Sequence, residues 1–179
     1  MPRLLDIFLT MLAPIIWGST YLVASEWIPD GDPITIAMLR ALPAGLLILI
    51  ILRQWPAKQQ YLQIGVLGLL NFTIFWTCLF ISAYRLPGGV AATLGAAQPL
   101  FIIAINYTLL RQHTAIVSIL AAALGLFGVA LLVLTPTAHL DSIGVFAALF
   151  GAASMALGTI LSKRWRGNSP LLALSLIHI

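Results

Sequence analysis

The chain consists of long apolar stretches separated by short polar connections. A helix needs about 20 mostly apolar residues to cross the hydrocarbon core of a bilayer. Six stretches meet this requirement: 5–28, 33–52, 61–84, 88–110, 115–134 and 143–161. A seventh apolar stretch begins at Pro170 and runs to the end of the sequence. The pattern predicts an all-α fold, a polytopic bundle of membrane-spanning helices.

Composition agrees with a membrane protein and excludes other classes. Hydrophobic residues make up 61% of the 179 residues and charged residues only 8%, against about 25% charged residues in soluble domains. So few charges cannot cover a water-exposed surface. The basic residues form no stripe, which argues against nucleic-acid binding. The single cysteine, Cys78, permits no internal disulfide and no metal-ligand spacing. We therefore expect neither a cofactor nor a bound metal.

The basic residues predict the orientation of the bundle. With the N-terminus in the cytoplasm, Arg85 falls outside and Arg40 lies within the second stretch. All other basic residues then fall inside: Arg3, Arg53, Lys58, Arg111, Lys163, Arg164 and Arg166. Cytoplasmic loops are enriched in Lys and Arg. The sequence therefore predicts a multi-pass protein of the cytoplasmic (inner) membrane with a cytoplasmic N-terminus.

The last residues do not fit the pattern of complete spans. Half a span would leave backbone groups unsatisfied in lipid. Residues 174–179 read Leu-Ser-Leu-Ile-His-Ile and can be back-translated into the end of a common transposase library adapter. Our hypothesis is that this segment is an adapter-derived artefact. Genomic sequence that continues normally through this point would exclude it.

The chain contains a weak internal repeat. Residues 13–27 can be set beside residues 151–165, with glycine, hydroxyl and tryptophan residues at comparable places. Five predicted spans separate the two copies, so the second copy is inverted in the membrane. Inverted repeats are typical of secondary transporters, which bind their substrates near the midplane where the repeats meet.

Several segments, in this order and spacing, resemble EamA-type members of the drug/metabolite transporter superfamily. They are Trp17-Gly-Ser-Thr-Tyr21, Pro33 with Arg40, Tyr84-Arg-Leu-Pro-Gly-Gly-Val-Ala-Ala92 running into Gln98-Pro99, and Gly125-Leu-Phe-Gly-Val-Ala-Leu-Leu132. The resemblance covers nearly all of residues 4–165. It implies ten spans in two inverted five-span repeats. Residues 1–134 would form the first five-helix repeat. Residues 135–173 would begin the second, with the sixth span at 143–161 and part of the seventh.

The resemblance also implies export of amino acids, other metabolites or drugs, which is the usual activity of the family. One departure matters. Many relatives carry an acidic residue near the cytoplasmic end of the fourth span, where this chain reads Leu110-Arg-Gln-His-Thr114. A role for that carboxylate is therefore not carried over.

Ionisable residues within a span are costly and indicate function. Arg40 lies seven residues after Pro33, about 10 Å along the helix. It is predicted either to bind a substrate carboxylate through two parallel hydrogen bonds or to play a structural part. The structural alternatives are pairing with Glu26 or with carbonyls, and snorkelling to the surface. Glu26 is interpreted either as a gating or proton-coupling carboxylate or as an interfacial residue.

Helical spacing gathers further polar groups on single faces. In the first span Trp17, Thr20, Tyr21 and Ala24 share a face; in the third, Asn71, Phe75, Cys78 and Ser82; in the fourth, Ala91, Gly95, Gln98, Ile102 and Asn106. We predict that Trp17, Thr20, Tyr21, Asn71 and Gln98 contact substrate together with Arg40. The alternative is that each amide joins two helices by a hydrogen bond. Pro99, beside Gln98, is predicted to kink its span, for gating or for packing.

The function that fits these features is secondary transport of a small-molecule substrate, with export of small polar metabolites such as amino acids as the leading hypothesis. The alternative within transport is an exporter of drugs or cationic compounds, which the scarcity of acids within the spans disfavours. A non-transporting scaffold or sensor is the alternative of another class. No catalytic constellation indicates an enzyme, and no phosphate-binding loop indicates an ATP-driven pump. Transport would then draw on a gradient, with protons as one coupling ion, or be facilitated.

Overall fold

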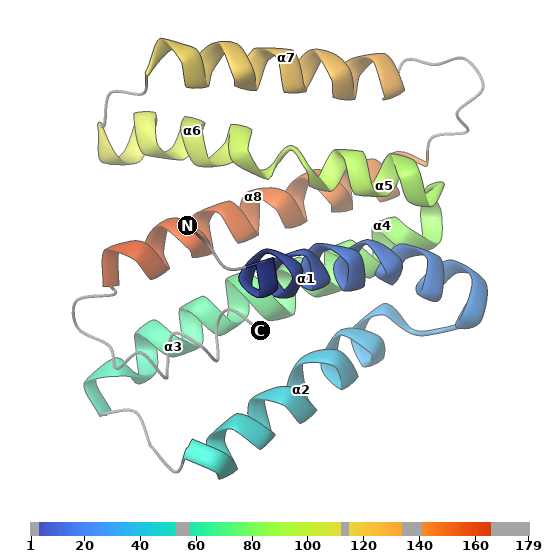
Figure 1. Ribbon diagram of the computed structural model, residues 1–179, viewed down its shortest axis with the longest axis vertical. Helices are drawn as coiled ribbons and strands as arrows, with labels where there is room; N and C mark the ends of the chain where they lie inside the picture. Colours follow the sequence, from blue (N-terminus) through green and yellow to red (C-terminus); the bar gives the residue numbers. More distant parts are fainter. Residues whose placement is uncertain (1–3, 53–57, 112–114, 134–140, 166–179) are drawn as a thin grey trace.

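The computed structural model describes residues 4–52, 58–111, 115–133 and 141–165, and every regular element in these ranges is a helix (Figure 1). Helix α1 (Leu4–Leu22) continues into the π-helical turn η1 (Val23–Trp27), and α2 spans Pro33–Leu52. The elements that follow are the 3-10 turn η2 (Lys58–Gln60), α3 (Tyr61–Gly68), the π-helical turn η3 (Leu69–Ile74), α4 (Phe75–Arg85), α5 (Gly88–Gly95), α6 (Gln98–Leu110), α7 (Ile116–Val133) and α8 (Ser142–Trp165).

The helices confirm the predicted class, a polytopic helical membrane bundle. Within the described ranges, three helices are long and apolar enough to cross a membrane: Tyr61–Arg85, Gly88–Thr108 and Ser142–Trp165. The first of them joins α3, η3 and α4, and the second joins α5 to α6. Three further predicted spans correspond to α1, α2 and α7, with 19, 20 and 18 residues. The predicted seventh span and residues 174–179 lie outside the described residues.

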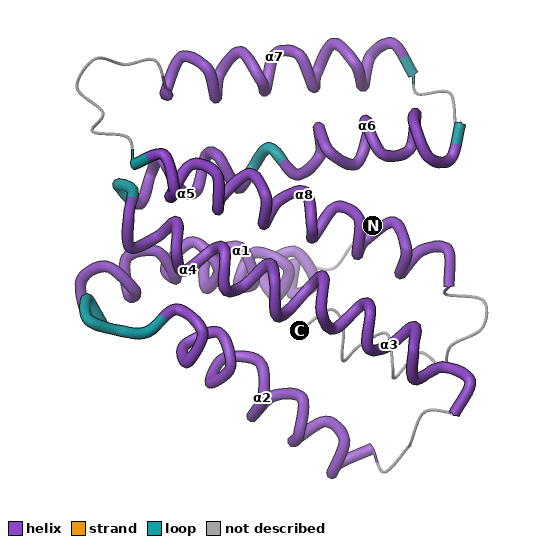
Figure 2. The backbone as a smooth tube through the Cα atoms, turned by 180° about the vertical axis from the view of Figure 1, so that it is seen from behind, coloured by secondary structure: helices purple, strands orange, loops and turns teal. Residues whose placement is uncertain are grey.

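Helix α8 occupies the middle of the bundle. It packs against α3, η3 and α4 on one side and against α5 and α6 on the other (Figures 1 and 2). Helix α2 packs on α4 at one edge, and α7 packs on α5 and α6 at the opposite edge. Helix α1 covers one face, where it contacts α5 and, through η1, α4.

The contact between α8 and the α3–α4 helix depends on three buried glycines. Gly144, Gly151 and Gly158 recur every seven residues and face the same partner helix. A Cβ atom added at Gly151 would lie 2.9 Å from Cβ of Cys78, and one added at Gly158 would collide with the amide of Asn71. Small residues let membrane helices approach closely. The glycines thus fix an antiparallel register, supported by a 2.9 Å hydrogen bond that Ser154 donates to the Leu70 carbonyl.

Charged residues divide between the two ends of the bundle. The end of α6, the start of η2 and the end of α8 lie at one end of the bundle (Figure 1). This end carries four described cations near the ends of these elements: Lys58, Arg111, Lys163 and Arg164. Arg85 lies at the opposite end with the acids Asp30, Asp32 and Asp141. The predicted orientation rests on this division of charge and stays a prediction.

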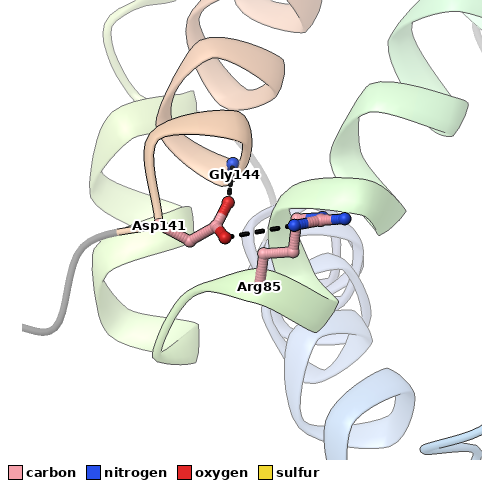
Figure 3. A network of polar contacts seen from close by, with 3 residues as sticks. All are labelled: Arg85, Asp141 and Gly144. Atoms are coloured by element: carbon pink, nitrogen blue, oxygen red, sulfur yellow. Dashed lines mark hydrogen bonds and ion pairs between the residues drawn. The ribbon is translucent and has the colours of Figure 1, made fainter.

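The Arg85 end is held by polar contacts between spans (Figure 3). Nη1 of Arg85 lies 3.1 Å from Oδ2 of Asp141, while Oδ1 of Asp141 accepts a 2.8 Å hydrogen bond from the backbone N–H of Gly144. The adjacent Tyr84 donates a 2.8 Å hydrogen bond to the carbonyl of Ile28, just beyond η1. The last turn of α4 is therefore linked by side-chain contacts to the neighbouring ends of the first and sixth spans.

The carboxyl of Asp141 makes this tie sensitive to acid. The Gly144 N–H and, to a smaller extent, the Arg85 guanidinium hold the pKa of Asp141 below its usual value of 3.8. A lowered folded-state pKa contributes stability at pH values above the unfolded-state pKa, and this stability is lost as the pH falls through the folded-state pKa.

We expect Asp141→Asn to keep the N-cap hydrogen bond but to lose this pH dependence. Asp141→Ala also removes the N-cap and should have a lower unfolding temperature than Asp141→Asn. Thermal unfolding of purified protein against pH would measure both. Asp30→Asn, which removes an exposed acid from the same end, is the control, and an equal effect of Asp30→Asn and Asp141→Asn would contradict the assignment.

Candidate functional site

The fourth span is interrupted midway, next to Pro99. Helix α5 ends at Gly95 and α6 begins at Gln98, with a turn at Ala96 and Ala97 between them. Proline has no N–H and its ring clashes with the preceding turn. The Gly95 carbonyl, four residues before Pro99, therefore loses its usual helical donor. The kink that the sequence predicts at Pro99 is a break in the helix, on its N-terminal side.

A cavity of about 400 Å³ lies beside this break. It brings together three residues that the sequence singles out, Tyr21 from α1 and Gln98 and Pro99 from α6. The other lining residues are Gly18, Phe75, Ala92, Gly95 and Ala96. The walls thus combine two aromatic rings and one amide with small residues, and none of the lining residues carries a charge. Such a surface suits a small solute that is bound by stacking and a few hydrogen bonds.

Tyr21 reaches the cavity because two glycines of α5 leave room for it. A Cβ atom added at Gly88 would lie 3.6 Å from Cβ of Tyr21, and one added at Gly95 would lie 3.2 Å from the Tyr21 hydroxyl. The ring therefore lies along α5, with its hydroxyl near the helix break.

A second polar group forms on the neighbouring side of α1 and α4. Nη1 of Arg40 in α2 donates a 2.8 Å hydrogen bond to Oγ1 of Thr20, and its guanidinium carbon lies 4.2 Å from the centre of the Trp76 ring. Sequence reasoning missed Trp76, since no periodicity within α4 indicates which residue of α2 lies opposite. Glu26, one of the predicted partners of Arg40, is exposed in η1 and forms no ion pair with it among the described contacts.

The remaining predicted residues lie elsewhere. Asn71 is buried between η3 and α8, where its amide donates a 3.1 Å hydrogen bond to the Leu67 carbonyl and lies against Gly158. Cys78 packs against Gly151 of the same helix α8. Asn71 and Cys78 of the predicted face in the third span therefore contact α8 in this structure, while Phe75 of the same face lines the cavity. Trp17 lies in α1, but its side chain is outside the described part of the structure.

The arrangement suits binding and passage of a solute. Within the described residues, no group of three or more His, Cys, Asp and Glu side chains is placed to hold a metal ion. The site has an interrupted helix, two aromatic rings and one amide, and a guanidinium lies on the neighbouring face of α1 and α4.

Comparisons with known proteins identify one protein family and several relatives. Residues 4–134 match the model of the EamA-like transporter family. The chain is 41% identical over 153 residues to protein PecM of Dickeya dadantii, a match covering 86% of this chain and 51% of PecM. It is 29% identical over 168 residues to the uncharacterized inner membrane transporter YedA of Escherichia coli K12, covering 90% of this chain and 55% of YedA.

A third relative is the uncharacterized transporter YvbV of Bacillus subtilis, 27% identical over 169 residues, with 92% of this chain and 55% of YvbV covered. The chain spans about half the length of these curated relatives. No solved structure matches it.

Proposed function

The chain belongs to the EamA-like transporter family, and from this premise we propose that it forms part of a secondary exporter of small polar metabolites such as amino acids. The family is one of membrane transporters and not of enzymes, so a small-molecule substrate and a bilayer environment follow from membership. The observation that carries the finer proposal is the cavity at the break between α5 and α6, with Tyr21 and Gln98 in its wall. Interrupted helices are where secondary transporters bind substrate.

The chemistry of the cavity supports a neutral or zwitterionic solute. Its volume of about 400 Å³ lies within the usual range for small-molecule sites, about 300–1,000 Å³. Its polar groups are the Tyr21 hydroxyl and the Gln98 amide, and no carboxylate lines it. The second candidate function, export of cationic compounds, is less well supported, because a cation at membrane depth would be expected to pair with an acidic residue in the cavity wall.

We further propose the orientation and repeat structure that the sequence predicts. The clustering of Lys58, Arg111, Lys163 and Arg164 at one end of the bundle supports a cytoplasmic N-terminus. Residues 1–134 would form the first five-helix repeat, and α8 would open the second, inverted one. Gradient-driven export, with protons as one coupling ion, completes the proposal.

Efflux measurements test the proposal. Cells that express the protein from its whole gene should release a preloaded panel of amino acids faster than cells without it. Gln98→Leu should slow this efflux about tenfold, because one hydrogen bond to a charged group contributes about 1.5–3 kcal/mol. Asn106→Leu is the matched control, since it removes an amide from the same helix outside the cavity. Equal efflux with and without the protein, across amino acids and cationic compounds alike, would overturn the proposal.

A further inference from the structure

Arg40 is a cation within a span, and the described residues give it no opposite charge. It lies seven residues after Pro33 in α2, about 10 Å along the helix axis, and it is exposed. Among the described residues, the ion pair that forms is the distant one between Arg85 and Asp141. Charged groups at membrane depth are costly and are normally paired or turned to a polar cavity. An acidic partner for the Arg40 guanidinium is therefore to be sought outside the described residues of the protein.

Three helices hold this guanidinium in one orientation. Thr20 of α1 accepts a hydrogen bond from Nη1 at 2.8 Å, and the Trp76 ring of α4 lies beneath the guanidinium at 4.2 Å. Trp76 is itself only 8% exposed. It stacks on Phe80 with ring centres 6.2 Å apart and meets the edge of Phe75 at 5.7 Å. An arginine that only snorkelled to the surface would not require such a buried aromatic support.

Among the described residues, the contacts of Arg40 with Thr20 and Trp76 leave most of its N–H donors available. Arginine has five N–H donors in one plane, and Thr20 occupies one of them. The contact with Trp76 brings the guanidinium carbon to 4.2 Å from the ring centre and is a cation–π contact, not a hydrogen bond to a conventional acceptor. A planar pair of donors matches the two oxygens of a carboxylate, which can accept two parallel hydrogen bonds.

The Arg40 group lies on the neighbouring face of two helices, α1 and α4, that also line the cavity. Thr20 and Tyr21 are consecutive in α1, and Phe75 and Trp76 are consecutive in α4. Tyr21 and Phe75 line the cavity, while Thr20 and Trp76 hold Arg40. We propose that Arg40, positioned by Thr20 and Trp76, binds the carboxylate of the transported solute and so selects for carboxylate-bearing substrates. This rests on the proposed function, to which it adds a substrate class and two positioning residues.

Transport kinetics in vesicles containing the whole gene product test the inference, with an α-amino acid compared with its carboxamide. Arg40→Gln should raise the KM for the acid about 10- to 100-fold, since a charge-assisted pair contributes about one to two factors of ten, and should leave the KM for the amide unchanged. The KM of Arg40→Lys for the acid should lie between those of wild type and Arg40→Gln, because lysine keeps the charge but lacks the planar pair of donors. Thr20→Val and Trp76→Leu should raise the KM for the acid selectively but less, and they decide the question if Arg40→Gln does not fold.

The possible outcomes separate the two proposals. Failure of the wild-type protein to transport any compound would refute the proposed function. Transport of acid and amide with the same change in KM in every variant, or with none, would leave transport intact and overturn the carboxylate site. If Arg40 instead pairs with an acidic side chain of the protein, its variants would affect acid and amide alike, which also overturns the inference.

Discussion

Gly151→Leu is expected to prevent α8 from seating against α4. A Cβ atom at position 151 would lie 2.9 Å from Cβ of Cys78 and 3.5 Å from the carbonyl oxygen of Phe75. Both atoms are fixed by the backbone of α4, so neither moves aside without moving the helix. Overpacking lowers the free energy of unfolding by about 1–3 kcal/mol, occasionally more. Leucine adds three carbons beyond Cβ, so we expect this variant to lose an amount at the upper end of that range. We expect little folded protein, and for Gly151→Ala a smaller loss.

The matched control is Gly65→Leu in α3. Gly65 is exposed, and a Cβ atom there would have no neighbour within 4 Å. Leucine favours helix more than glycine does, by about 1 kcal/mol, so this variant should be at least as stable as wild type. Monodisperse protein remaining after heating in detergent measures both. If Gly151→Leu survives heating as well as Gly65→Leu, the close approach of α4 and α8 is wrong.

Ala92→Phe is expected to block transport while leaving the fold intact. Ala92 lines the cavity beside Tyr21 and Gln98, and it is exposed there. A phenyl ring at this position would occupy the space that the solute needs. A clash of about 1–3 kcal/mol with bound solute lowers occupancy about 5- to 150-fold, so efflux at low substrate concentration should fall by the same factor, at least about fivefold.

Ala104→Phe serves as the control for this variant. Ala104 is also exposed, lies on α6 of the same span and does not line the cavity. Both substitutions add the same apolar surface, so protein amount and bundle stability should be alike. Efflux per molecule should be lost only in Ala92→Phe, and unimpaired efflux in that variant would remove the cavity from the transport path.

The helices and their approximate limits were predictable from the sequence because the bilayer sets the length of an apolar run. The two ends of the bundle were also predictable, because the short connections between the spans carry the charged residues. The break in the fourth span followed from Pro99, since the missing N–H is a local property of that residue. The sequence singled out Tyr21, Gln98 and Pro99, and one cavity brings these three together; their part in transport stays a prediction.

What only the tertiary structure decided is which face of each helix meets which neighbour. In a bilayer an apolar side chain is equally suited to facing another helix or the lipid. The hydrophobic pattern therefore does not fix the rotation of a helix about its axis. Asn71 and Cys78 therefore contact α8, whereas Phe75 of the same predicted face lines the cavity. Likewise, Thr20 and Trp76, rather than Glu26, contact Arg40. These contacts join residues of different spans, and the close packing allowed by Gly144, Gly151 and Gly158 determines where they meet.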